Sequence, residues 1–309
     1  MSEHMNYFVS SRGLLKSCDY FSLEPRSSIR QLINYPDFNS IKNTNNTNSI
    51  KNPTIYVCSS AIPHFINAML ALIDFKFILV SGDCDETIPI EIFLERDFNK
   101  FLDDMRLVHW FSQNMVARHE KITIMPIGLD YHTMTSRTIW GPITPCLDQE
   151  RILENIIKNS RPFYERTCKC YANYHFSMNT RHAYDRQDAL KDIPRDLVFY
   201  EVSQVNRLIT WNRQKDYAFV ISPHGGGLDC HRTWEALALA CIPIVKTSQI
   251  DDLFLDLPVL IVREWSDITQ ELLDKTVQDF KYRHNNNEFN YKKLSLAWWL
   301  NRINSYKNI

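Results

Sequence analysis

Segments typical of β-strands and α-helices alternate along this chain of 309 residues, and the alternation runs twice. In the first run, β-rich segments over 54–59, 75–81 and 121–125 accompany an apolar helical pattern over 65–73. Strands that alternate with helices form parallel sheets joined by right-handed crossovers. The first half of the chain is therefore predicted to form one open α/β unit.

The second half repeats this pattern. Strands are expected over 169–176, 197–200, 217–221, 242–245 and 259–262, and helices over 186–192, 202–212 and 229–240. The sequence therefore predicts an α/β protein with two Rossmann-like domains, over residues 1–160 and 161–285, followed by a C-terminal segment over 286–309. Residues 36–53 are polar and rich in Asn, Thr and Ser, which indicates a flexible insert in the first domain.

Composition excludes several classes of protein. The formal net charge is −1, so no general basic field attracts nucleic acid. The first twelve residues lack an apolar signal core, and the most apolar stretch, 61–80, is interrupted by polar residues and a proline, so no membrane span is expected. The eight cysteines have no repeated spacing, which predicts free thiols in a reducing compartment. We expect a cytoplasmic protein.

Three of the seven glycines are consecutive, at Gly225, Gly226 and Gly227, between a predicted strand and a predicted helix. Glycine permits unusual dihedral angles and a close approach of the backbone to a ligand, and the N-terminus of the following helix attracts anions. The cluster therefore predicts a diphosphate site. A His-Gly-Gly-Gly run also occurs in esterases, but these need a Gly-x-Ser-x-Gly turn downstream, and no glycine follows Gly227. A purely structural turn is the other alternative.

The helix expected over 229–240 carries a second signal. Asp229 is a candidate N-cap, and Arg232 and Glu235 lie three residues apart, which places them on one face. Arg232 would then meet phosphate through its planar fork of donors, and Glu235 would accept hydrogen bonds from ribose hydroxyls. The alternative is a surface ion pair.

Read together, Ser222-Pro223-His224-Gly225, Asp229, Arg232 to Leu237 and Ala240 to Val245 resemble the C-terminal motif of exostosin-like glycosyltransferases. This motif covers about 25 residues, and the N-terminal half is similar to the family only in layout. The resemblance implies the GT-B architecture, in which two Rossmann-like domains face each other across a cleft. It implies that the C-terminal domain binds the donor nucleotide, the N-terminal domain binds the acceptor, and the last helix packs back on the N-terminal domain. The donor-binding residues would be Asn173, Arg186, Ser222, His224, Gly225, Gly226, Gly227, Asp229, Arg232 and Glu235.

Candidate catalytic residues follow strands of the first domain. Asp83 and Asp85 form an Asp-x-Asp motif, which holds Mn²⁺ or Mg²⁺ in the unrelated GT-A glycosyltransferases. They could instead cap a turn, bind the acceptor or act as a general base. An inverting transfer needs such a base, and Asp130 and His132 are further candidates. Pro243 stands where retaining enzymes of this architecture often have a second acid, which favours inversion.

We therefore expect a glycosyltransferase that moves a sugar from a nucleotide-diphosphate sugar to a hydroxyl of a glycan or glycoprotein, with inversion and without a metal or other cofactor. One alternative is a metal-dependent transferase that uses Asp83 and Asp85. The other is an inactive module that binds sugar nucleotides.

Overall fold

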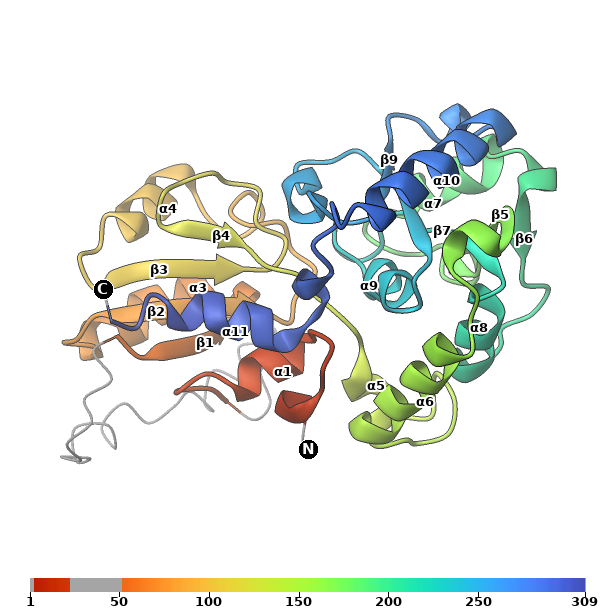
Figure 1. Ribbon diagram of the computed structural model, residues 1–309. Helices are drawn as coiled ribbons and strands as arrows, with labels where there is room; N and C mark the ends of the chain where they lie inside the picture. The colour runs from red at the N-terminus through yellow and green to blue at the C-terminus, as the bar shows by residue number, and fades with distance from the viewer. Residues whose placement is uncertain (1–2, 23–51, 309) are drawn as a thin grey trace.

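The computed structural model describes residues 3–22 and 52–308. Within these ranges the chain is an α/β protein with two parallel sheets, one of four strands and one of five (Figure 1). This confirms the predicted fold class at the level of two Rossmann-like sheets. All but the last two positions of the expected insert, 36–53, lie outside the described residues.

The first sheet contains strands in the order in which they occur along the chain. Its strands are β1 (Thr54–Cys58), β2 (Phe77–Gly82), β3 (Leu107–Ser112) and β4 (Ile122–Ile124), and every neighbouring pair is parallel. Both faces of the sheet are covered: Phe77 and Leu79 belong to one apolar cluster, and Ile78 and Val80 to another. This two-sided burial is typical of parallel sheets.

The second sheet has the order β6-β5-β7-β8-β9. Its strands are β5 (Thr167–Ala172), β6 (Val198–Tyr200), β7 (Tyr217–Ile221), β8 (Ile242–Lys246) and β9 (Leu260–Val262). The direction in which strands are added reverses between β5 and β7. In open α/β sheets, ligands bind outside the carboxyl ends of the strands at such a reversal.

Helices flank the two sheets. They are α1 (Ser11–Lys16), α3 (Ile62–His64), α4 (Glu95–Leu102), α5 (Tyr131–Ser136), α6 (Cys146–Lys158), α7 (Ala183–Asp192), α8 (Arg207–Gln214), α9 (His231–Ala238), α10 (Gln270–Asn285) and α11 (Leu296–Asn304). On one face of the second sheet, Val220 shares a core cluster with Trp211 of α8 and Trp234 of α9. The other face packs on α7 and α10.

Two predicted elements are shorter than expected. The strand expected over 169–176 ends at Ala172, and a short 3-10 helix follows it at Tyr174–Phe176. The helix expected over 202–212 begins at Arg207, because the side chain of Asn206 accepts a hydrogen bond from the Ile209 amide and caps it. Both shifts lengthen the loops at the carboxyl ends of β5 and β6.

The C-terminal segment lies against the first sheet, where α11 is drawn in blue beside β1 and β2 (Figure 1). The Leu296 amide donates to the Tyr7 carbonyl at 2.8 Å, and the Val9 amide donates to the Leu294 carbonyl at 2.9 Å. Beyond α11, the Tyr306 ring stacks on His109 of β3 with 4.0 Å between the ring centroids. Both ends of the described chain therefore join the N-terminal half.

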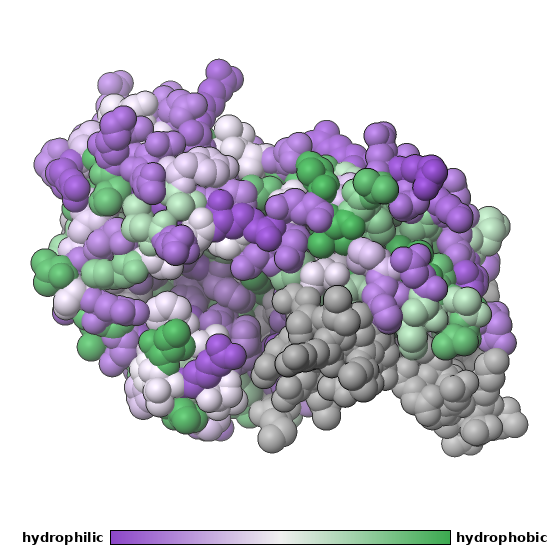
Figure 2. All heavy atoms as spheres, turned by 180° about the vertical axis from the view of Figure 1, so that it is seen from behind, coloured by the Kyte–Doolittle hydropathy of each residue, from purple (hydrophilic) through white to green (hydrophobic). Residues whose placement is uncertain are grey.

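The surface seen from behind is mixed, with hydrophobic side chains scattered among hydrophilic ones (Figure 2). All eight cysteines are free thiols, as predicted. None of the helices in the described ranges combines the length and the apolar character that a bilayer span requires.

Candidate functional site

A cavity of about 310 Å³ lies at the reversal of strand order in the second sheet. The loop after β5 contributes Asn173 to Ser177 except His175, and the loop after β7 contributes the three glycines. The first half of the chain supplies Asp85, Ile127 and Asp130. Loops from both sheets therefore converge on one cavity.

Three arginines line the cavity, and two of them, Arg186 and Arg232, form no ion pair with a carboxylate of the described residues, whereas Arg207 is paired. Arg186 of α7 donates from Nε to the His224 carbonyl at 3.0 Å and from Nη1 to the Ser177 carbonyl. Arg232 of α9 donates from Nη1 to the Pro223 carbonyl at 3.1 Å. Burial, and then the positive charge of Arg232, lower the pKa of Arg186 to about 10. Within residues 3–22 and 52–308, neither guanidinium forms an ion pair with a carboxylate, so two positive charges face the cavity without a protein counter-ion.

The glycine cluster leaves no room for side chains. A Cβ atom at Gly225 would lie 2.6 Å from Arg186 Nη2, one at Gly226 2.1 Å from Asp85 Oδ2, and one at Gly227 2.7 Å from Asn114 Nδ2. None of the three has a positive φ, so a left-handed backbone is not the reason for glycine here. The glycines instead let one arginine and two side chains of the N-terminal half approach the loop.

Helix α9 begins at His231, four residues after the last glycine, and Cys230 occupies its N-cap. The prediction that Asp229 caps this helix is wrong. Its carboxylate instead accepts hydrogen bonds from the Ile127 amide at 2.7 Å and the Trp234 indole at 2.8 Å. Burial raises the pKa of Asp229 to about 6. Asp229 lines the cavity and joins the two halves of the chain.

Glu235 lines the cavity but does not pair with Arg232, so the surface ion-pair interpretation is wrong. Its carboxylate accepts a hydrogen bond from the Trp211 indole at 3.1 Å and lies 3.5 Å from Nε of Arg207. Arg207 also donates to Asp130 Oδ2 at 3.0 Å. One buried arginine of α8 thus holds a carboxylate from each half of the chain.

Two predicted donor-binding residues, Ser222 and His224, do not line the cavity. The Ser222 and Thr233 hydroxyl oxygens are 2.9 Å apart, and Nδ1 of His224 donates to the Leu228 carbonyl at 2.8 Å. The His224 amide donates to Asp185 Oδ2 at 2.8 Å. Both residues fix the shape of the loop from behind, whereas Asn173 lines the cavity.

Asp83 and Asp85 contact different partners. Asp83 lies 3.3 Å from Arg12 Nε and accepts a hydrogen bond from the Tyr56 hydroxyl at 3.2 Å, and burial raises its pKa although Arg12 opposes the shift. Asp85 is exposed, lines the cavity and lies against Gly226. Across the described part of the chain, no three His, Cys, Asp or Glu side chains are grouped so that they could hold a metal ion.

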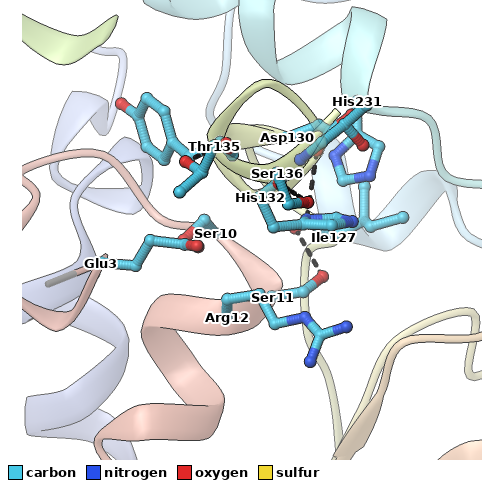
Figure 3. A network of polar contacts seen from close by, with 12 residues as sticks. Glu3, Ser10, Ser11, Arg12, Ile127, Asp130, His132, Thr135, Ser136 and His231 are labelled. Atoms are coloured by element: carbon cyan, nitrogen blue, oxygen red, sulfur yellow. Dashed lines mark hydrogen bonds and ion pairs between the residues drawn. The ribbon is translucent and has the colours of Figure 1, made fainter. Parts of the chain in front are cut away.

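The candidate bases Asp130 and His132 form a pair at the start of α5, with 3.1 Å between Asp130 Oδ1 and His132 Nδ1 (Figure 3). Burial alone would raise the pKa of Asp130, but Arg207 and two histidines outweigh it and lower that pKa. Burial lowers the pKa of His132 to about 4, against the opposing effect of Asp130. Asp130 lines the cavity and His132 does not. Asp130 is therefore a weakly basic, paired carboxylate.

Sequence reasoning missed several residues of the cavity wall. Arg207, Thr210 and Gln214 line it at positions i, i+3 and i+7 of α8, and this polar spacing was the available signal. The Oε1 atom of Gln214 is buried and has no hydrogen-bond partner among the described residues. Another missed residue is His231, which immediately precedes Arg232.

No protein-family model matches this chain, and neither does any curated protein.

Proposed function

We propose that this protein is a GT-B glycosyltransferase of the exostosin-like type, which transfers a sugar from a nucleotide-diphosphate sugar to an acceptor hydroxyl with inversion. The observation that carries the proposal is the pair Arg186 and Arg232, whose guanidinium groups line a cavity at the strand reversal and have no carboxylate partner in the described part of the chain. A diphosphate supplies the missing negative charge, and arginine binds phosphate oxygens through two parallel hydrogen bonds.

The remainder of the cavity suits a nucleoside. Glu235 uses its two oxygens for Trp211 and Arg207 and retains lone pairs for ribose hydroxyls. Gln214 Oε1 is buried and accepts no hydrogen bond from the described residues, so an N–H or O–H group of a bound ligand would satisfy it. Glu235 and Gln214 line the same cavity as Arg186 and Arg232.

The acceptor would enter from the N-terminal half, which contributes Asp85, Ile127 and Asp130 to the cavity lining. In the transfer, the acceptor oxygen bonds to the anomeric carbon while the bond from that carbon to the diphosphate breaks. The leaving diphosphate gains negative charge beside Arg186 and Arg232. Positive groups placed where charge develops are among the largest contributions to enzyme catalysis.

Release of nucleoside diphosphate from sugar nucleotides tests the proposal. UDP-glucose, UDP-galactose, UDP-N-acetylglucosamine, GDP-mannose and GDP-fucose would each be incubated with the protein, with water or a mixture of simple glycosides as acceptor. We expect release from at least one donor, a product of inverted anomeric configuration by proton NMR, and undiminished rates in EDTA. Loss of activity in EDTA would favour the metal-dependent alternative, and binding without turnover would favour an inactive binding module.

A further inference from the structure

His231 occupies the boundary between the two halves of the cavity. It is the first residue of α9, directly before Arg232, and both line the cavity. Successive residues of a helix point about 100° apart, and these two side chains have different partners. Arg232 contacts the Pro223 carbonyl beside the glycines, whereas His231 contacts the Gly128 carbonyl of the N-terminal half.

The contact with Gly128 determines which nitrogen of the neutral ring carries hydrogen. His231 Nδ1 lies 2.7 Å from the Gly128 carbonyl oxygen, which can only accept a hydrogen bond. Nδ1 must therefore donate, and Nε2 is left with its lone pair. No hydrogen bond joins Nε2 to any residue in the described ranges.

Three carboxylates and a second histidine lie around His231. Asp83, Asp130 and Asp229 all interact electrostatically with His231, and His132 lies with its ring centroid 6.2 Å away. Figure 3 shows His231 from α9 next to His132 from α5 and Asp130, the N-cap of that helix, with Arg12 of α1 nearby. Carboxylates around an imidazole stabilise the imidazolium that general-base catalysis creates.

We propose that His231 is the general base of the transfer, a role that rests on the proposed glycosyltransferase function. Nε2 removes the proton from the acceptor hydroxyl as that oxygen bonds to the anomeric carbon. The bond between this carbon and the diphosphate oxygen breaks, and the diphosphate leaves with the electron pair beside Arg186 and Arg232. The three acids and one histidine predicted from sequence are less suited: Asp83 and His132 do not line the cavity, Asp130 is paired with Arg207, and the Asp85 side chain is exposed.

The test uses His231→Asn, because the asparagine amide can still donate to the Gly128 carbonyl while the basic Nε2 is deleted. Wild type and variant would be compared with the sugar nucleotide of the panel that wild type turns over fastest, and by calorimetry with UDP and GDP. We expect kcat to fall by about 10²–10⁴-fold and the dissociation constant of the nucleoside diphosphate to stay within about threefold. His119→Asn, an exposed histidine of the N-terminal half, is the matched control and should leave kcat unchanged.

Circular dichroism and a second variant, His231→Gln, distinguish loss of the base from loss of the fold. If wild type turns over the donor and either folded variant keeps kcat within about threefold, the assignment of His231 is overturned while the proposed function stands. A fall in kcat in His132→Asn but not in His231→Asn would also overturn it. If wild type turns over no donor, the proposed function fails, and the inference fails with it.

Discussion

Substitution of Gly226 by alanine should destabilise the protein through one identifiable contact. The added Cβ would lie 2.1 Å from Asp85 Oδ2, and ordinary van der Waals contact begins at 3.4 Å. The carboxylate or the loop must therefore move by the difference, 3.4 − 2.1 = 1.3 Å. Because Asp85 is exposed, its side chain can turn away from the added methyl group, and an off-rotamer side chain costs about 0.5–1.5 kcal/mol, so Gly226→Ala should lower the free energy of unfolding by that amount.

A double-mutant cycle isolates the contact. Asp85 is exposed and has no hydrogen bond or ion pair with another described residue, so Asp85→Ala alone should change stability by less than about 0.5 kcal/mol. In the double variant the obstructing carboxylate is gone, and most of the stability should return. Urea denaturation of the four proteins measures the coupling. Additive effects in the double variant would refute the argument that Asp85 is the reason for glycine at 226.

Two further substitutions have expected effects of defined sign. Gln214→Leu removes a buried hydrogen-bond acceptor that has no partner among the described residues, so it should raise the free energy of unfolding by about 1 kcal/mol. The same substitution should weaken nucleotide binding about tenfold. Lower stability with unchanged affinity would contradict this. For Asp229, burial raises the folded-state pKa to about 6 from the ordinary aspartate value of 3.8, so its contribution to stability is fully present below pH 3.8 and is lost as pH rises through 6. The free energy of unfolding of wild type minus that of Asp229→Asn, measured by urea titration, should fall between these pH values; a difference that rises or stays constant would contradict this assignment.

The layout of the fold was readable from local patterns. Apolar segments of strand length, separated by helical periodicity, predicted two parallel sheets, and both are present. The boundaries of elements were less predictable where a side chain of the preceding loop caps a helix. Asn206 caps α8, so this helix begins at Arg207, five residues after the expected start at position 202. The reversal of strand order between β5 and β7 depends on packing across the whole sheet, so no local pattern encoded it.

The candidate site was predictable only in part. The glycine cluster marked the loop after β7, but the atoms that require glycine there belong to Arg186, Asp85 and Asn114, which are distant in sequence. Local sequence predicted that the Asp229 carboxylate caps the following helix. It instead accepts a hydrogen bond from the Ile127 amide, which is 102 residues away in the sequence. Long-range partners of this kind determine the roles of polar residues, and the spacing of residues along the sequence does not predict them.

Arg186 and Arg232 are proposed to form the diphosphate site on which the glycosyltransferase activity depends. Calorimetric titration of UDP and GDP into wild type, Arg186→Ala and Arg232→Ala tests this directly, with the exposed Arg263→Ala as the matched control and thermal denaturation as the check of folding. Loss of one charge-assisted contact costs about 1.5–3 kcal/mol, so each cavity variant should bind the nucleotide roughly 10- to 100-fold more weakly while the control binds like wild type. Equal affinity in all four proteins, or no binding of either nucleotide by wild type, would contradict the claim.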